Sequence, residues 1–129
     1  MRAVDTNVVV RLLTADDVDQ FARVKALFDA HEVFIPTTVV LETEWVLRKA
    51  YGLTTPVIME ALGGLAGTSN VHVHDPLLLS RALEAVAGGL DFADALHLAA
   101  SVGCADFVSF DRPLARRAAR LGTLPVVEP

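Results

Sequence analysis

Short apolar runs alternate with longer helical segments along the chain, and this alternation constrains the fold more than any other feature. The apolar runs lie at residues 3–4, 33–35, 71–73, 107–109 and 125–127. The helical segments lie at residues 8–13, 16–30, 37–51, 54–63, 76–87, 92–102 and 111–121, although the valines of the first also fit a longer strand. Short strands separated by helices build a parallel sheet with helices on both faces. We therefore predict a three-layer α/β/α fold around a central parallel sheet of four to five strands.

Length and composition are typical of one domain. A chain of 129 residues is long enough to bury a core, and we predict a single domain over residues 1–129. Hydrophobic residues make up 53% of the sequence, but no apolar run approaches the roughly 18 residues that span a bilayer. The single cysteine excludes an intramolecular disulfide, and the first residues do not read as a secretory signal. We expect a cytoplasmic protein without a membrane partner.

Charge is unevenly distributed along the chain. The net charge of −5 argues against a general nucleic-acid binder held by phosphate contacts. However, a C-terminal stretch carries four of the eleven basic residues, Arg112, Arg116, Arg117 and Arg120. This pattern fits an acidic site with a basic rim, and it equally fits one solvated helix face.

Carboxylates follow the predicted strands, at the edge where open α/β sheets bind their ligands. Asp5 ends the first strand, and Asp111 comes just after the fourth. Asp91 and Asp94 open the helix before that fourth strand. Helix capping explains each aspartate taken singly. Together with Glu42, however, separate segments deliver carboxylates to one end of the sheet.

Glu42 is the carboxylate that capping does not explain. The residues three and four positions away are Thr38, Val39, Trp45 and Val46. None of them is basic, so the spacing predicts an apolar setting for Glu42. Glu44, in contrast, has Arg48 four residues on, which is typical of a surface ion pair. A carboxylate in an apolar setting needs a partner that offsets the cost of burying its charge. We expect that partner to be a metal ion.

Converging carboxylates indicate a particular chemistry. At neutral pH they raise one another's pKa or bind cations. Oxygen ligands without His or Cys select hard ions such as Mg²⁺ or Mn²⁺. Such ions retain waters and bind phosphates, which indicates phosphodiester or phosphoryl chemistry.

Four segments carry a resemblance to a known family. They are V-D-T-N at 4–7, V-L-E-T-E-W-V-L-R at 40–48, D-F-A-D-A-L-H-L-A-A at 91–100 and F-V-S-F-D at 107–111. Each segment is weakly specific, but together they resemble the PIN-domain family, and within it the VapC-type toxins of bacterial and archaeal toxin–antitoxin pairs. The segments come in the family's order and cover nearly the whole chain.

The resemblance implies a metal-dependent ribonuclease and its site. It carries the catalytic and metal-binding roles onto Asp5, Glu42, Asp94 and Asp111. It gives supporting positions to Asn7 and Ser109, and to Asp91 either such a role or only that of a helix cap. Bound Mg²⁺ or Mn²⁺ would activate water for in-line attack on an RNA phosphodiester. We expect Arg112, Arg116 and Arg117 to steer RNA phosphate toward this site.

The resemblance also implies partners. The family is generally dimeric, so we expect a homodimer, and a cognate antitoxin protein would silence it. The substrate would be RNA, read most readily where its bases are unpaired.

Two other functions stay open on the residues alone. A non-catalytic α/β partner-binding module would use every aspartate as a helix cap and leave Glu42 unexplained. A phosphatase of the haloacid dehalogenase type also opens with Asp on a first strand, but it needs a second Asp two residues on. Asn7 stands at that position here.

Overall fold

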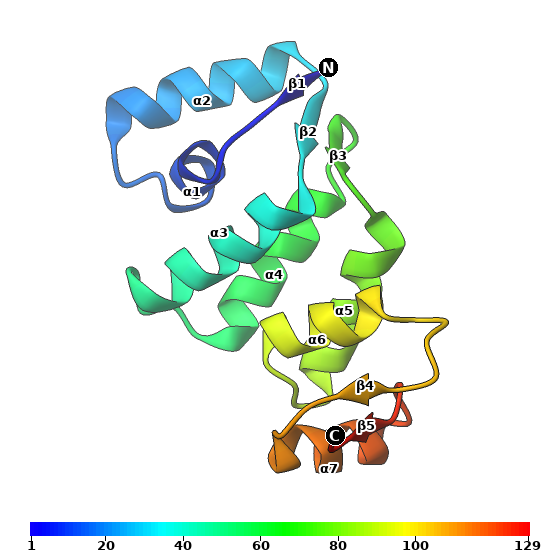
Figure 1. Cartoon of the computed structure of the whole chain (residues 1–129). Coiled ribbons are helices and arrows are strands. Elements are labelled where there is room, and N and C mark those ends of the chain that lie inside the picture. The colour runs from blue at the N-terminus through cyan, green and yellow to red at the C-terminus, as the bar shows by residue number, and fades with distance from the viewer. The chain divides into compact units, whose positions relative to one another are not determined.

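In a computed structural model that describes all 129 residues, strands and helices alternate along the chain (Figure 1). The chain divides into two units, Met1–Pro76 and Leu77–Pro129. The elements of the first are β1 (Arg2–Ala3), α1 (Thr6–Thr14), α2 (Val18–Ala30), β2 (Val33–Ile35), α3 (Thr37–Lys49), α4 (Thr55–Ala66) and β3 (Val71–Val73). The elements that follow are α5 (Pro76–Ala87), α6 (Phe92–Ala100), β4 (Phe107–Val108), α7 (Arg112–Leu121) and β5 (Val126–Val127).

The first unit is built on a parallel sheet with the strand order β1-β2-β3. Arg2 pairs with Val33 and Val33 pairs with Val71, so the strands start in register. Each connection between neighbouring strands runs through two helices, as parallel pairing requires. Because the strands are parallel, β1 and β2 end at the same edge of the sheet, where α1 and α3 begin.

Capping and burial explain why the valine-rich segment after β1 is helical. Asp5 is the extended residue before α1, and its side chain accepts a hydrogen bond from the Thr6 amide. Val9 and Val10 lie in the core. Ala15 ends the helix in the left-handed conformation, with φ of 51°. The longer strand that the sequence left open is therefore not formed.

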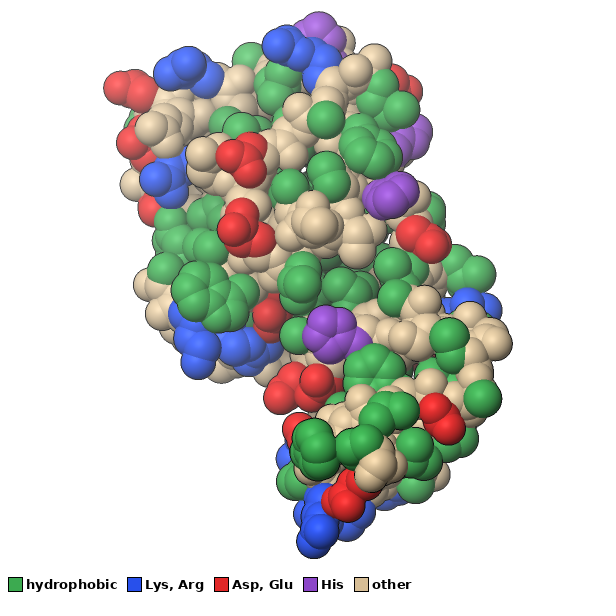
Figure 2. Space-filling view, viewed as in Figure 1, with side chains coloured by type: hydrophobic (Ala, Val, Ile, Leu, Met, Phe, Trp, Pro, Cys, Tyr) green, Lys and Arg blue, Asp and Glu red, His purple; other side chains and the backbone are tan.

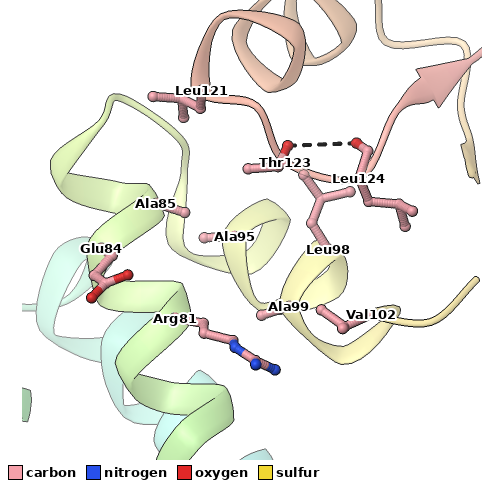
Figure 3. Close-up of a pocket in the computed structure, with 10 residues that line it drawn as sticks. All are labelled: Arg81, Glu84, Ala85, Ala95, Leu98, Ala99, Val102, Leu121, Thr123 and Leu124. Carbon is pink, nitrogen blue, oxygen red and sulfur yellow. Dashed lines mark hydrogen bonds between the residues drawn. The ribbon is translucent and has the colours of Figure 1, made fainter.

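The second unit contains a separate two-stranded parallel sheet. α7 connects β4 to β5, and Phe107 pairs with Val126 in that sheet. Buried Phe92 and Leu98 on α6 and Leu114 on α7 form part of its core. An apolar pocket lies among α5, α6 and the turn after α7, and Figure 3 shows its alanine and leucine side chains. None of the predicted site residues lines this pocket.

The α/β class with parallel strands is confirmed, and all predicted elements form. The five strands, however, belong to a three-stranded and a two-stranded sheet, whereas we predicted them in one central sheet. Strand periodicity predicts where strands occur, and long-range packing decides which edges pair. A smaller difference is that α4 continues through Gly63 and Gly64, because Leu62 and Leu65 on either side are buried.

No helix of the chain combines the length and the apolar character that crossing a membrane requires.

Candidate functional site

Asp5, Asn7 and Glu42 line one surface pocket in the first unit. Asp5 stands between β1 and α1, and Glu42 projects from the middle of α3. α1 and α3 pack against each other. This packing brings the start of α1 close to Glu42, and Thr6 contacts Glu42 although the two residues are 36 positions apart in the sequence. The predicted neighbourhood of Asp5, Asn7 and Glu42 is therefore present within this unit.

A hydrogen bond from Thr6 orients Glu42. The hydroxyl group of Thr6 donates to Oε1 of Glu42. Thr6 itself is buried, at 6% exposure, and it lines the same pocket as Asp5 and Glu42. Sequence reasoning missed Thr6, although it stands in the V-D-T-N segment between two of the predicted site residues.

The predicted apolar setting of Glu42 is wrong. Glu42 is exposed, whereas Glu44 is buried at 6% exposure. The buried face of α3 carries Val40, Thr43, Glu44 and Leu47. Glu44 is stabilised there by Arg48, whose Nη2 lies 2.6 Å from Oε1 of Glu44. The ion pair was predicted correctly, but its Glu44 carboxylate is buried, whereas we predicted a surface pair.

Arg11 and Tyr51 complete the pocket of Asp5 and Glu42. Nη1 of Arg11 donates to the Tyr51 hydroxyl at 3.0 Å, and that hydroxyl donates to Asp16 at 2.7 Å. The hydrogen bond from Tyr51 is the main reason why the pKa of Asp16 lies below its usual value. A guanidinium group thus lines the same pocket as two carboxylates. The spacing of Arg11 one turn beyond Asn7 was the available signal in the sequence.

Asp91, Asp94 and Asp111 interact within the second unit. Asp91 precedes α6 but makes no capping hydrogen bond with its side chain, and Asp94 lies in the first turn. Partial burial raises the pKa of Asp94 above its usual value, and the negative charges of Asp91 and then Asp111 raise it further. His97 and Arg117 act in the opposite direction. Asp94 therefore holds its proton more readily than an ordinary aspartate does, and a cation bound nearby would favour the charged form.

Asp111 is positioned by its own helix and by Ser109. Oδ1 of Asp111 accepts a hydrogen bond from the Leu114 amide at 2.9 Å. The Asp111 amide donates to Oγ of Ser109 at 3.0 Å. Asp111 is thus a helix cap, and Ser109 fixes the backbone from which its carboxylate projects.

The predicted basic residues lie on α7, and Figure 2 shows basic side chains gathered over this helix. Arg112, Arg116 and Arg117 are all exposed. Arg112 forms an ion pair with Glu128 at 2.7 Å. Arg117 is close enough to Asp94 to lower its pKa. Arg117 therefore combines exposure with proximity to a predicted site residue.

The chemistry of the predicted metal ligands fits a hard divalent cation. The residues predicted to bind metal supply only carboxylate oxygens in each unit, and Mg²⁺ and Mn²⁺ prefer such ligands. Within neither unit do three or more His, Cys, Asp or Glu side chains gather closely enough to hold an ion. The first unit contributes Asp5 and Glu42, and the second contributes Asp91, Asp94 and Asp111.

Comparison with known proteins identifies related sequences and folds. A family model described as the PIN domain matches residues 2–120. Among solved structures, the chain is similar to Mycobacterium tuberculosis VapC20, whose description is a toxin that cleaves the sarcin–ricin loop. The identity is 22%, each chain is covered over 100% of its length, and the TM-score is 0.46. No curated protein matches the sequence.

Proposed function

This chain belongs to the PIN domain family, and on that premise we propose that it is a metal-dependent endoribonuclease, the toxin of a toxin–antitoxin pair. The pocket shared by Asp5 and Glu42 carries the proposal. Its two carboxylates are oxygen donors of the kind that Mg²⁺ and Mn²⁺ prefer. A bound Mg²⁺ or Mn²⁺ ion would activate water for attack on an RNA phosphodiester.

We assign metal binding and catalysis to Asp5, Glu42, Asp94 and Asp111. The family model runs through both units, and we therefore propose one PIN domain over residues 1–129. Asn7, Ser109 and Asp91 have supporting roles.

The chain's own groups prepare this site in three ways. Thr6 orients Glu42 by donating to its carboxylate. The Leu114 amide and Oγ of Ser109 hold Asp111 in place. Arg116 and Arg117, exposed on α7, attract the RNA phosphates that the acidic groups would otherwise repel.

The proposed partners are RNA, a cognate antitoxin protein and a second copy of the chain. Exposed Val18, Trp45 and Leu77 provide apolar surface for protein contacts. Such a toxin acts in the cytoplasm, where its RNA substrate is.

The test compares wild type with Asp5→Asn on labelled structured RNAs in Mg²⁺, in Mn²⁺ and in EDTA. Asn preserves the shape and the hydrogen bond from Thr6 but lacks the charge that a metal needs. We expect cleavage only by the wild type and only with metal. Asp29→Asn is the matched control, because Asp29 is an exposed residue of α2 that pairs with Lys25 at 2.7 Å. A folded wild type that cut no RNA and bound no divalent ion by calorimetry would contradict the proposal.

A non-catalytic partner-binding module is the second candidate. It is favoured by the backbone hydrogen bonds that the carboxylates of Asp5 and Asp111 accept. In that case Asp5→Asn would change stability slightly, since Asn is also a good helix cap, and no divalent ion would bind. The phosphatase alternative lacks support, because the matching family is the PIN domain and Asn7 replaces the acid/base aspartate.

A further inference from the structure

The rings of His97 and Phe107 stack on each other in the second unit. Their centroids are 6.4 Å apart, and the ring planes differ by only 12°. His97 is exposed on α6, and Phe107 lies half-buried on β4 beneath it. The chain has a second such pair, Phe34 and His74, but those rings are tilted by 59° at 6.0 Å. The parallel arrangement is thus a property of His97 and Phe107 alone.

The stacked pair lies beside the acidic residues of this unit. His97 follows Asp94 by three residues, and it is close enough to influence the ionisation of that carboxylate. Phe107 begins the strand that leads through Ser109 to Asp111. A group resting on the exposed face of His97 would therefore lie near Asp94, whose ionisation Asp111 also influences.

Local structure does not account for the exposed imidazole ring. The ring of His72 pairs with Glu32 at 3.2 Å, whereas the ring of His97 makes no hydrogen bond or ion pair. The ring of Phe107 lies nearly parallel to the imidazole, and the His97 side chain remains open to solvent. A flat ring with an exposed surface is suited to stacking against another flat ring.

We propose that His97, aligned with the ring of Phe107, is a stacking platform for one unpaired base of the RNA next to the bond that is cut. This inference rests on the proposed ribonuclease function and adds the position of a substrate base. Proteins bind single-stranded nucleic acid by combining aromatic platforms with basic side chains. Arg117, which also acts on Asp94, supplies a nearby positive charge. A base within a duplex is covered on both faces by its neighbours, so the platform selects single-stranded or loop RNA.

The experiment measures RNA binding without cleavage, using the full chain in EDTA. The probes are a series of single-stranded RNAs, each of which carries 2-aminopurine at a different position. Stacking quenches the fluorescence of this base. We expect His97→Ala to weaken binding about tenfold and to abolish the quenching at one position. His97→Tyr preserves a flat ring and should restore both. His74→Ala is the matched control and should change neither.

A second readout separates stacking from charge. Loss of a stacking contact leaves the salt dependence of binding unchanged, whereas loss of a phosphate contact reduces it. We therefore expect equal salt dependence for wild type and His97→Ala. The platform is refuted if His97→Ala binds RNA with the affinity of wild type, or if His97→Tyr binds as weakly as His97→Ala. It is also refuted if duplex RNA binds as tightly as single-stranded RNA, or if the chain binds no RNA.

The outcomes also separate this inference from the proposed function. Metal-dependent cleavage that is lost in Asp5→Asn, combined with unchanged binding by His97→Ala, would keep the ribonuclease and reject the platform. Quenching that depends on His97 in a chain that neither cuts RNA nor binds a divalent ion would keep the platform and reject the ribonuclease.

Discussion

Replacement of Glu44 by Ala is predicted to destabilise the fold far more than replacement of Glu42. Glu44 is 6% exposed, and its Oε1 accepts hydrogen bonds from Nε and Nη2 of Arg48 at 2.8 and 2.6 Å. Glu42 is exposed and accepts one hydrogen bond from Thr6. The two residues stand on the same helix and differ mainly in what surrounds them.

The magnitude follows from these contacts. Removal of one partner of a buried ion pair costs about 3–5 kcal/mol when the other charge stays buried. The side chain of Arg48 is 34% exposed and keeps its hydrogen bond to Thr55, so water stabilises part of its charge. We therefore expect Glu44→Ala to lower the free energy of unfolding by about 2 kcal/mol. Glu42→Ala removes a single hydrogen bond and should cost about 1 kcal/mol or less.

Urea denaturation followed by far-UV circular dichroism measures both values. With a denaturant dependence of about 2 kcal/mol per M, Glu44→Ala should lower the midpoint by about 1 M. Glu44→Gln preserves the shape without the charge and should lie between wild type and Glu44→Ala. Equal midpoints for Glu42→Ala and Glu44→Ala would show that the burial argument is wrong.

Further predictions concern charge and backbone conformation. The pKa of Asp94 is raised in the folded state, so its charged form disfavours folding. In the absence of metal, Asp94→Asn should therefore have a higher melting temperature than wild type at pH 7. Thermal scans should show this difference disappear below about pH 4. The pKa of Asp16 is lowered mainly by Tyr51, so Tyr51→Phe should lose stability above about pH 4, and the difference from wild type should shrink as the pH falls through the folded-state pKa. Urea titrations should show Gly64→Ala more stable by about 0.5–1 kcal/mol, because Gly64 is inside α4 with open space around a Cβ atom. Gly122→Ala should be less stable by roughly 1 kcal/mol, since Gly122 ends α7 with φ of 68°; the opposite signs would contradict this.

The acidic residues illustrate how far local reasoning extends. The positions of Asp5, Asp91 and Asp111 at helix starts were predictable, because a polar residue after an apolar run and before a helical one has few other conformations. Whether each side chain makes a capping bond was not predictable. Asp5 and Asp111 make one and Asp91 does not. That difference depends on side-chain rotamers, which neighbouring elements influence.

The prediction that Glu42 lies in an apolar setting failed because it used only neighbours within one helix. Neighbours three and four residues away describe one stripe of a helix, but they do not show which stripe faces the core. α3 packs against α1 and α4, and these contacts bury the stripe of Glu44 and expose the stripe of Glu42. The hydrogen bond from Thr6 then holds Glu42 by a contact between distant segments.

By itself, the sequence determined the order of the elements and the type of most of them, the carboxylate-rich donor set and the resemblance to the PIN-domain family. These depend on backbone preferences within a few residues or on short ordered motifs. Only the tertiary structure decided that the strands form two sheets, that Glu44 is the buried carboxylate and that His97 stacks on Phe107. Such contacts join residues that are distant in the chain or on different elements, and their free energy depends on how whole helices and strands pack.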